Sequence, residues 1–237
     1  GLMNWGVLLF PGSNCAEDCF HAIDQILEKP VKYLWHKDTD LGDVDAIIIP
    51  GGFSYGDHLR PGAIAHFSPA MTAVKEFALN GGLVIGICNG FQILTESKML
   101  PGSLMQNRGL KFLCQDQTLK VDNAQTAFTS EYKSGDTVVF PIAHNEGNYY
   151  AAPETIAEME ANGQILFRYS NPEGVVNDDT NPNGSINSIA GIVNRKGNVM
   201  GMMPHPERSS DITLGLSDGK GVFVSMLRHL EAQHGQD

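Results

Sequence analysis

The sequence lacks the features that mark membrane-inserted and nucleic-acid-binding proteins. No apolar run approaches the roughly 20 residues that a membrane-spanning helix needs, and no basic start followed by an apolar core marks a signal peptide. The 16 Lys and Arg residues are outnumbered by 27 Asp and Glu residues, which gives a formal net charge of −11. The basic residues form no cluster. We therefore expect neither a membrane nor a nucleic acid as a partner.

Cysteine is scarce, with four residues and no spacing typical of a disulfide framework. Cys15 and Cys19 lie four residues apart on an expected helix, but no His or Cys pair with zinc-finger spacing follows, so we expect no zinc site. We interpret Cys15, Cys19 and Cys114 as buried thiols, because free cysteine is among the most buried residue types. Such cysteine usage indicates a reducing compartment, and we expect the protein to be cytoplasmic.

Motifs that bind nucleotide phosphates are missing as well. The sequence has no P-loop, no Gly-x-Gly-x-x-Gly and no acidic metal cluster on a recognisable scaffold. We therefore expect no cofactor in this chain, neither ATP nor a metal ion.

The composition is that of an ordinary globular enzyme, with 42% hydrophobic residues. No repeat and no linker divides the sequence, so we expect one domain over residues 3–237. Gly1 and Leu2, ahead of Met3, resemble an expression scar.

One short apolar run ends on a cysteine between two glycines, in the order Gly86-x-Cys88-x-Gly90. The run 83–87 is rich in β-branched residues and follows an Asn-Gly-Gly turn, which predicts a buried strand, and residues 91–96 predict the start of a helix. Cys88 is thus expected on a strand-to-helix turn. This is the cysteine form of a nucleophile elbow, whose tight turn leaves no room for side chains two positions to either side. We interpret Cys88 as a nucleophile rather than a structural thiol.

A cysteine nucleophile needs an imidazole to take its proton and a carboxylate to orient that imidazole. Both are found in Pro204-His205-Pro206-Glu207. Pro206 disfavours the helical conformation at His205, so we expect an extended chain in which His205 and Glu207 project to the same side. Taken alone, the segment also fits a surface turn with a solvated charge. Together with the elbow it favours a Cys-His-Glu triad.

A glycine-rich turn follows another predicted buried strand, in the sequence Pro50-Gly51-Gly52-Phe53. Because parallel sheets place their sites at the carboxyl ends of strands, this turn is expected beside the elbow. The backbone N–H groups of Gly52 and Phe53, with that of Asn89, are candidate donors of an oxyanion hole. A phosphate-binding loop is the competing interpretation, but no Lys-Ser/Thr pair follows the glycines.

These motifs carry a family resemblance that covers nearly the whole chain. Gly-Ile-Cys-Asn-Gly-Phe-Gln (86–92), Pro-His-Pro-Glu-Arg (204–208) and Pro-Gly-Gly-Phe-Ser-Tyr-Gly-Asp (50–57) resemble the triad-type (class I) glutamine amidotransferases. More closely, they resemble the glutaminase subunits of phosphoribosylformylglycinamidine synthases. One departure is Asn145, in Ala-His-Asn-Glu-Gly (143–147), where the family usually has glycine. Asparagine tolerates a left-handed backbone, so we expect this loop to keep its shape.

The resemblance implies an activity and a set of partners. The implied activity is hydrolysis of L-glutamine to glutamate and ammonia through a γ-glutamyl thioester on Cys88, with Gln92 in contact with the substrate. The ammonia would pass to a large synthase subunit that uses ATP and Mg²⁺ to convert formylglycinamide ribonucleotide to the amidine in purine biosynthesis, with a small bridging subunit alongside. Docking of that partner is expected to align the loop 51–56, with the adjoining residues 57–60 as a contact surface.

Three other functions remain open on the sequence alone. A glutaminase subunit of another amidotransferase, for GMP, CTP or carbamoyl phosphate, would share the chemistry. A cysteine hydrolase or chaperone-like relative of the same fold would share the elbow without needing Pro-His-Pro-Glu. A non-catalytic binding subunit would be expected to lose Cys88, His205 or Glu207, and none of these is lost.

The alternation of strand and helix patterns predicts an α/β fold with an open, mostly parallel doubly wound sheet, the nucleophile elbow and extra β-hairpins in the C-terminal half. Residues 170–188, rich in Asn, Asp, Pro and Gly, are expected to form a loop. The predicted strands are 5–10, 31–35, 46–49, 83–87, 119–121, 137–142, 165–169 and a hairpin of 189–193 and 199–203, and the predicted helices are 16–27, 68–79 and 221–229.

Overall fold

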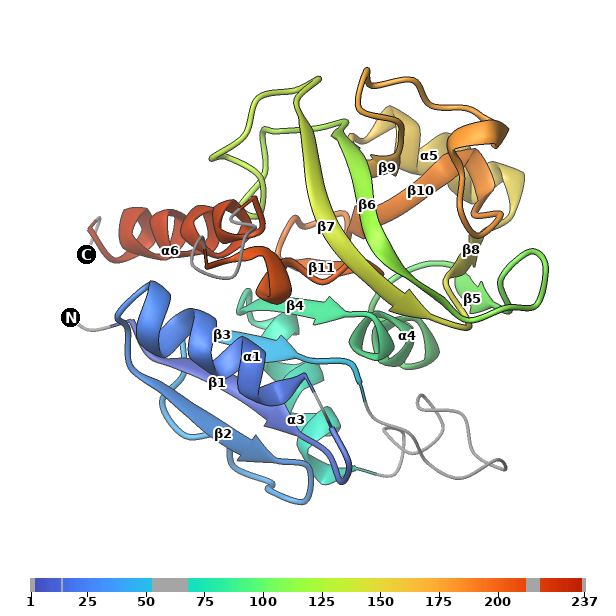
Figure 1. Ribbon diagram of the computed structural model, residues 1–237. Helices are drawn as coiled ribbons and strands as arrows, with labels where there is room; N and C mark the ends of the chain where they lie inside the picture. The colour runs from blue at the N-terminus through green and yellow to red at the C-terminus, as the bar shows by residue number, and fades with distance from the viewer. Residues whose placement is uncertain (1–2, 14, 53–67, 212–217, 236–237) are drawn as a thin grey trace.

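The computed structural model describes residues 3–13, 15–52, 68–211 and 218–235. Its centre is a nine-stranded sheet with the strand order β2-β1-β3-β4-β11-β10-β9-β6-β7 (Figure 1). The first five strands in this order run parallel, and the remaining four are joined by antiparallel pairings. The α/β class is therefore confirmed, and the antiparallel half supplies the extra hairpins that were predicted.

The centre of the parallel half forms because its strands are short, rich in β-branched residues and apolar on both faces. In the adjacent strands β3 and β4, every residue is buried. The hairpin of β10 and β11 was predicted correctly, and its second strand pairs with β4 in parallel. This pairing connects the C-terminal part of the chain to the elbow strand. The strands of this half are β1 (Trp5–Leu9), β2 (Val31–Trp35), β3 (Ala46–Ile49), β4 (Leu83–Ile87) and β11 (Val199–Met202).

Helices cover both faces of the parallel half, with α1 in front of the strands and α3 behind them in Figure 1. The predicted helix 16–27 is α1 (Ala16–His21) continued by a π-helix, η1 (Ala22–Ile26). Pro69 fits the first turn of its helix because the missing N–H needs no partner there. The remaining helices of this half are α3 (Pro69–Leu79), α4 (Asn89–Glu96) and α6 (Lys220–His234).

In the antiparallel half, β6 and β7 are longer than predicted, because alternating burial in β7 continues to His144 and the exposed first half of β6 pairs with this extension. Cys114 was predicted to be buried, which is wrong: it lies in the solvent-facing first half of β6 and is exposed. The elements of this half are β6 (Leu113–Val121), β7 (Thr137–His144), β9 (Ile165–Tyr169), β10 (Ile189–Val193) and the short 3₁₀ turns η2 (Asp178–Thr180), η3 (Ile186–Ser188) and η4 (Pro206–Ser209).

Besides the 3₁₀ turns, three short elements were missed by the sequence analysis. They are a two-stranded sheet of β5 (Ser103–Met105) and β8 (Asn148–Tyr150), and the helix α5 (Pro153–Ala161). The strands have three residues each, too few for an alternation pattern to show. The helix is acidic and buries only Ile156 and Met159, so its periodicity is weak.

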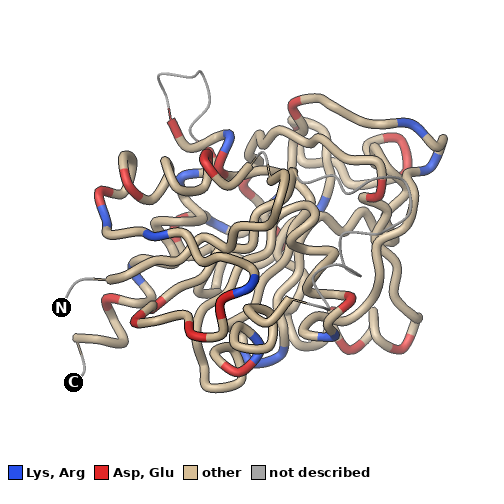
Figure 2. The backbone as a smooth tube through the Cα atoms, turned by 90° about the horizontal axis from the view of Figure 1, so that it is seen from below, with Lys and Arg blue, Asp and Glu red and all other residues tan. Residues whose placement is uncertain are grey.

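Acidic residues are spread over the surface, with Lys and Arg interspersed among them (Figure 2). In the described part of the chain, no helix combines the length and the apolar character needed to cross a membrane.

Candidate active site

Cys88 occupies the strand-to-helix turn between β4 and α4 that the sequence predicts. Its backbone angles are φ 56° and ψ −111°, and a positive φ of this kind is rare for any residue other than glycine. The glycines that flank Cys88 are required because neighbouring backbone atoms leave no room for a side chain. A Cβ atom on Gly90 would overlap the carbonyl oxygen of Ile49, and one on Gly86 would lie 2.6 Å from the carbonyl oxygen of Gly90.

Backbone hydrogen bonds fix Cys88 between the two halves of the sheet. Its N–H donates to the carbonyl oxygen of Met202 at 2.8 Å, at the end of β11. Its Sγ lies 3.5 Å from the carbonyl oxygen of Ala143, in β7. Cys88 as a whole is 4% exposed, so it is shielded from solvent by the segments that meet there.

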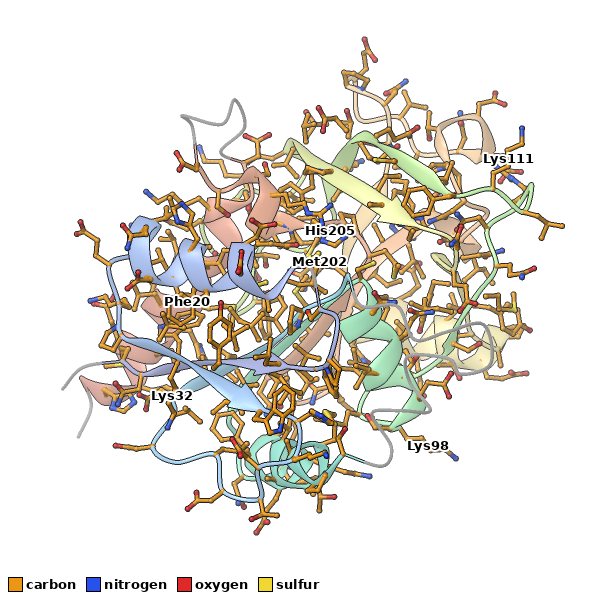
Figure 3. The ribbon with its side chains drawn as sticks, turned by 60° about the horizontal axis from the view of Figure 1, so that its bottom comes forward. Phe20, Lys32, Lys98, Lys111, Met202 and His205 are labelled. Carbon is orange, nitrogen blue, oxygen red and sulfur yellow. The ribbon has the colours of Figure 1, made fainter. Side chains whose placement is uncertain are left out.

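His205 follows β11 directly and is therefore brought to the same end of the sheet as Cys88. Its backbone N–H donates to the carbonyl oxygen of Pro141 at 2.8 Å. Figure 3 shows His205 close to Met202. The ring is 1% exposed, and Nε2 has no hydrogen-bond partner among the described residues. This nitrogen is free to exchange a proton with a reacting group.

Glu207 orients the ring, as its Oε1 lies 2.5 Å from Nδ1 of His205. Burial alone would lower the pKa of His205, but the charges of Glu207 and then Cys88 raise it well above its ordinary value. The predicted extended chain holds for His205 only. The 3₁₀ turn η4 begins at Pro206, so Glu207 reaches the ring through a turn rather than along an extended strand.

Cys15 also belongs to this site, which the sequence analysis missed. It is fully buried, and its Sγ, a ring nitrogen of His205 and a carboxylate oxygen of Glu207 all lie within 4.8 Å of one another. These three groups are of types that bind zinc. However, Nη2 of Arg208 donates to Sγ at 2.9 Å, so a guanidinium already places positive charge beside the sulfur. The available signal was the position of Cys15 just after β1, at the carboxyl edge of the parallel strands.

His144 is a second buried histidine near the site that the sequence analysis did not single out. Burial and the charge of His205 lower its pKa to about 4, so the ring is neutral at ordinary pH. Its Nε2 lies 3.1 Å from Nδ2 of Asn183, which is fully buried. Asn145, next in the chain, is not among the described residues with left-handed backbone, so the expected reason for its tolerance there was wrong.

A chain of side-chain hydrogen bonds connects the glycine-rich turn to the elbow helix. The N–H of Gly52 donates to Oδ1 of Asn89 at 2.9 Å, and Nδ2 of Asn89 donates to Oε1 of Gln92 at 2.9 Å. Nε2 of Gln92 in turn donates to Oε2 of Glu146 at 2.9 Å. The structure thus brings the turn and the elbow together. The amide of Gly52 is occupied by a side chain here, and Phe53 and residues 54–60 lie outside the described residues.

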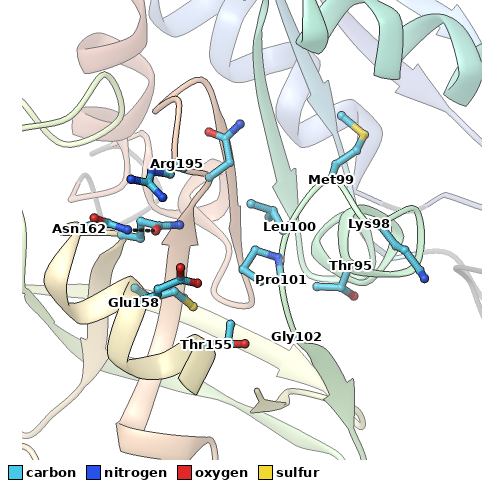
Figure 4. Close-up of a pocket in the computed structure, with 13 residues that line it drawn as sticks. Thr95, Lys98, Met99, Leu100, Pro101, Gly102, Thr155, Glu158, Asn162 and Arg195 are labelled. Carbon is cyan, nitrogen blue, oxygen red and sulfur yellow. Dashed lines mark hydrogen bonds between the residues drawn. The ribbon is translucent and has the colours of Figure 1, made fainter. Parts of the chain in front are cut away.

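A cavity of about 600 Å³ lies elsewhere, between the end of α4, α5 and the turn of the β10–β11 hairpin (Figure 4). Arg195, in that turn, is at the opposite end of β11 from His205. The lining of this cavity includes none of Cys88, His205 and Glu207. It is therefore distinct from the candidate active site.

Comparison with known proteins agrees with this geometry. Residues 3–217 match the model of the CobB/CobQ-like glutamine amidotransferase domain. The chain therefore belongs to the glutamine amidotransferase family.

Within that family, the similarity to one group of subunits extends over the whole chain. It is 56% identical over 225 residues, 95% of each chain, to phosphoribosylformylglycinamidine synthase subunit PurQ of Moorella thermoacetica. It is 54% identical to the subunit of the same name from Acaryochloris marina, with 98% of each chain covered. The solved structure of PurLQS from Thermotoga maritima contains a chain with a TM-score of 0.85 and 39% identity, covering 97% of this chain and 100% of that one.

Proposed function

We propose that the chain is the glutaminase subunit of a phosphoribosylformylglycinamidine synthase, which hydrolyses L-glutamine and supplies ammonia to a partner synthase. The observation that carries the proposal is the buried, hydrogen-bonded pair of His205 and Glu207 beside the strained Cys88. Relatives more than 50% identical over nearly the whole chain bear the name of that subunit.

The first chemical step transfers the thiol proton of Cys88 to Nε2 of His205. The resulting thiolate attacks the side-chain amide carbon of glutamine and gives a tetrahedral oxyanion. As this intermediate collapses, the imidazolium protonates the leaving nitrogen, which departs as ammonia, and a γ-glutamyl thioester remains on Cys88.

The second step hydrolyses the thioester. Neutral His205 takes a proton from water, the hydroxide attacks the thioester carbonyl, and glutamate leaves as the thiol of Cys88 is restored. Glu207 holds the ring through Nδ1 and stabilises its charged form in both steps. The raised pKa of His205 supports this role, because it reports strong stabilisation of the imidazolium.

The backbone N–H groups of Gly52, Phe53 and Asn89 are proposed to bind the oxyanion. Because the amide of Gly52 donates to Asn89 in this structure, its use as an oxyanion donor requires the Asn89 side chain to give way. We propose that docking of the synthase produces this rearrangement, so that glutamine is not wasted when no acceptor is present. Gln92, buried between Asn89 and Glu146, is the proposed substrate contact.

Amidine formation from an amide requires activation by ATP. We propose that ATP and Mg²⁺ bind the large synthase subunit, and that a small bridging subunit completes the complex. The similarity to a chain of the Thermotoga maritima structure, which is named PurLQS, supports such an assembly. The four free cysteines fit the cytoplasm as the proposed compartment.

The test is ammonia release from glutamine by the isolated chain and by the chain reconstituted with the synthase subunits, ATP and formylglycinamide ribonucleotide. We expect the isolated chain to be nearly idle and the complex to release ammonia in step with amidine formation. Equal rates with and without the synthase would contradict the proposed coupling. No glutamine hydrolysis in either preparation would contradict the function itself.

A further inference from the structure

The guanidinium of Arg208 has an unexpected partner. Arg208 follows Glu207 directly in η4, yet its Nη2 donates to Sγ of Cys15 at 2.9 Å, and its Nε lies 3.7 Å from a carboxylate oxygen of Asp18. Cys15 and Asp18 both belong to the start of α1. The guanidinium is therefore held against α1 rather than against its sequence neighbour.

The pairing of Arg208 with α1 matters because the carboxylate of Glu207 would be a strong alternative partner for the guanidinium. Its Oε2 is buried and has no hydrogen-bond partner among the described residues. Arginine presents five donors in a planar fork that fits a carboxylate in a two-point arrangement. A direct pair of Arg208 with Glu207 would satisfy Oε2, but it would also compete with His205 for the carboxylate.

Cys15 lies where it can prevent that competition. The sulfur is fully buried, within 4.8 Å of both the His205 ring nitrogen and the Glu207 carboxylate, and it accepts the hydrogen bond from Arg208. It thus contacts the guanidinium and lies close to both members of the His205–Glu207 pair. The groups that face this pair are Cys15, Cys19, Cys88, His144, Arg208 and Asp18.

We propose that Cys15 is a positioning residue, whose sulfur holds the Arg208 guanidinium away from Glu207 and so reserves the carboxylate for His205. The inference rests on the proposed function of the site. It assigns no chemical step to Cys15. The arginine still contributes its positive charge at a distance from Glu207, without displacing the imidazole from the carboxylate.

The test compares Cys15→Ala with Cys19→Ala in the complex reconstituted with the synthase. Cys19 is a matched control, since it is a fully buried cysteine one turn further along the same helix. We expect Cys15→Ala to lower kcat by about tenfold with KM nearly unchanged, and Cys19→Ala to leave kcat within about twofold of wild type. Equal kcat for the two variants would overturn the proposal.

The pH dependence of kcat supplies a readout that a packing role would not move. If Arg208 shares Glu207 with His205, the imidazolium is less stabilised. The limb of the pH–kcat profile that follows the titration of His205 then moves to lower pH in Cys15→Ala. Cys15→Ser keeps an acceptor for Arg208, and we expect it to restore most of the wild-type profile. An unchanged limb in Cys15→Ala would overturn the proposal.

Two further variants keep the test decisive if Cys15→Ala folds poorly. Asp18→Asn changes a half-exposed side chain, loosens the same guanidinium and should shift the limb in the same direction. In an Arg208→Leu background, the Cys15→Ala shift should disappear, because there is no guanidinium left to reposition. A shift that persists without Arg208, or no shift in Asp18→Asn, would overturn the proposal. Wild-type complex that hydrolyses no glutamine would instead refute the proposed function.

Discussion

Single residues of this site are defined by burial as much as by chemical type. Glu207, His205 and Cys15 are each almost inaccessible, so their charges and hydrogen bonds act with little screening by water. A buried carboxylate that holds an imidazole in one tautomer also stabilises the charged ring, as in serine protease triads. The activity of this site should therefore depend on the negative charge of Glu207 rather than on the shape of its side chain.

Glu207→Gln tests that dependence. The amide keeps the volume but loses the charge and can support the wrong tautomer of His205, so we expect kcat to fall by about 10²–10⁴-fold. Steady-state ammonia release from the reconstituted complex measures it. Glu231→Gln, the same change at an exposed position of α6, is the control and should leave kcat unaltered. A loss of less than about threefold in Glu207→Gln would remove Glu207 from the proposed triad.

His144 gives a prediction about stability and pH. Its pKa is about 4 in the folded protein and about 6.5 when unfolded, so the unfolded chain binds more protons between these values. Stability is therefore lost as the pH falls from 6.5 toward 4, by up to about 3 kcal/mol from this group alone. His205, whose pKa is raised, acts in a different window: its contribution is complete below its unfolded pKa and is lost as the pH rises through its folded pKa.

Urea unfolding at pH 7 and pH 5 measures the His144 contribution. The wild type should lose more stability over this interval than His144→Gln, which cannot take up a proton. The comparison is His234→Gln, at a ring that is 42% exposed and pairs with Asp45 at 3.2 Å, where we expect a smaller change in the pH dependence than in His144→Gln. The same slope in His144→Gln and wild type would show that burial of His144 does not govern acid sensitivity.

At the scale of secondary-structure elements, the site depends on three chain ends that meet at one edge of the sheet. β4 delivers Cys88, β11 delivers His205, and the chain after β1 delivers Cys15. At the elbow, the start of α4 also packs closely on β3, because Gly90 lies directly against the carbonyl of Ile49 at the end of β3. The geometry of the elbow therefore requires glycine, which has no Cβ atom, at position 90.

Gly90→Ala should displace the elbow and lower both stability and activity. The added methyl group must move either β3 or the start of α4, and overpacking of this kind costs about 1–3 kcal/mol. Gly81→Ala is the control: its φ of +92° carries a backbone cost of about 1–2 kcal/mol, but its Cβ would meet no atom within 4 Å. Thermal unfolding and ammonia release together test this. We expect similar losses of stability but loss of activity only in Gly90→Ala, and full activity in that variant would show that the elbow tolerates a side chain there.

The parts of the site that the sequence predicts are those with a local signal. The elbow is visible because β-branched residues, two glycines and a cysteine lie within eight positions, and His205 and Glu207 lie two residues apart. Cys15 and His144 have no such pattern, because their place in the site depends on how α1 and β7 pack against η4. The 3₁₀ turn at Pro206 was missed since the proline constrains the residue before it more clearly than the residues after it.

At the scale of the whole molecule, the parallel half of the sheet carries the elbow, and the antiparallel half closes over it. Cys88 touches both halves, through Met202 of β11 and Ala143 of β7. The proposed nucleophile is thus placed at the junction of the two halves. This arrangement fits the proposed subunit, in which Cys88 is shielded from bulk solvent while ammonia is released toward a partner.

The most direct test of Cys88 as the nucleophile is the site of covalent modification by a glutamine-like affinity label. The reconstituted protein is treated with the label, digested and analysed by mass spectrometry, with excess glutamine as a protecting control. We predict one adduct, on Cys88, that is suppressed by glutamine and absent from His205→Ala. An adduct on Cys15, Cys19 or Cys114 in place of Cys88, or labelling that glutamine does not suppress, would contradict the proposed chemistry.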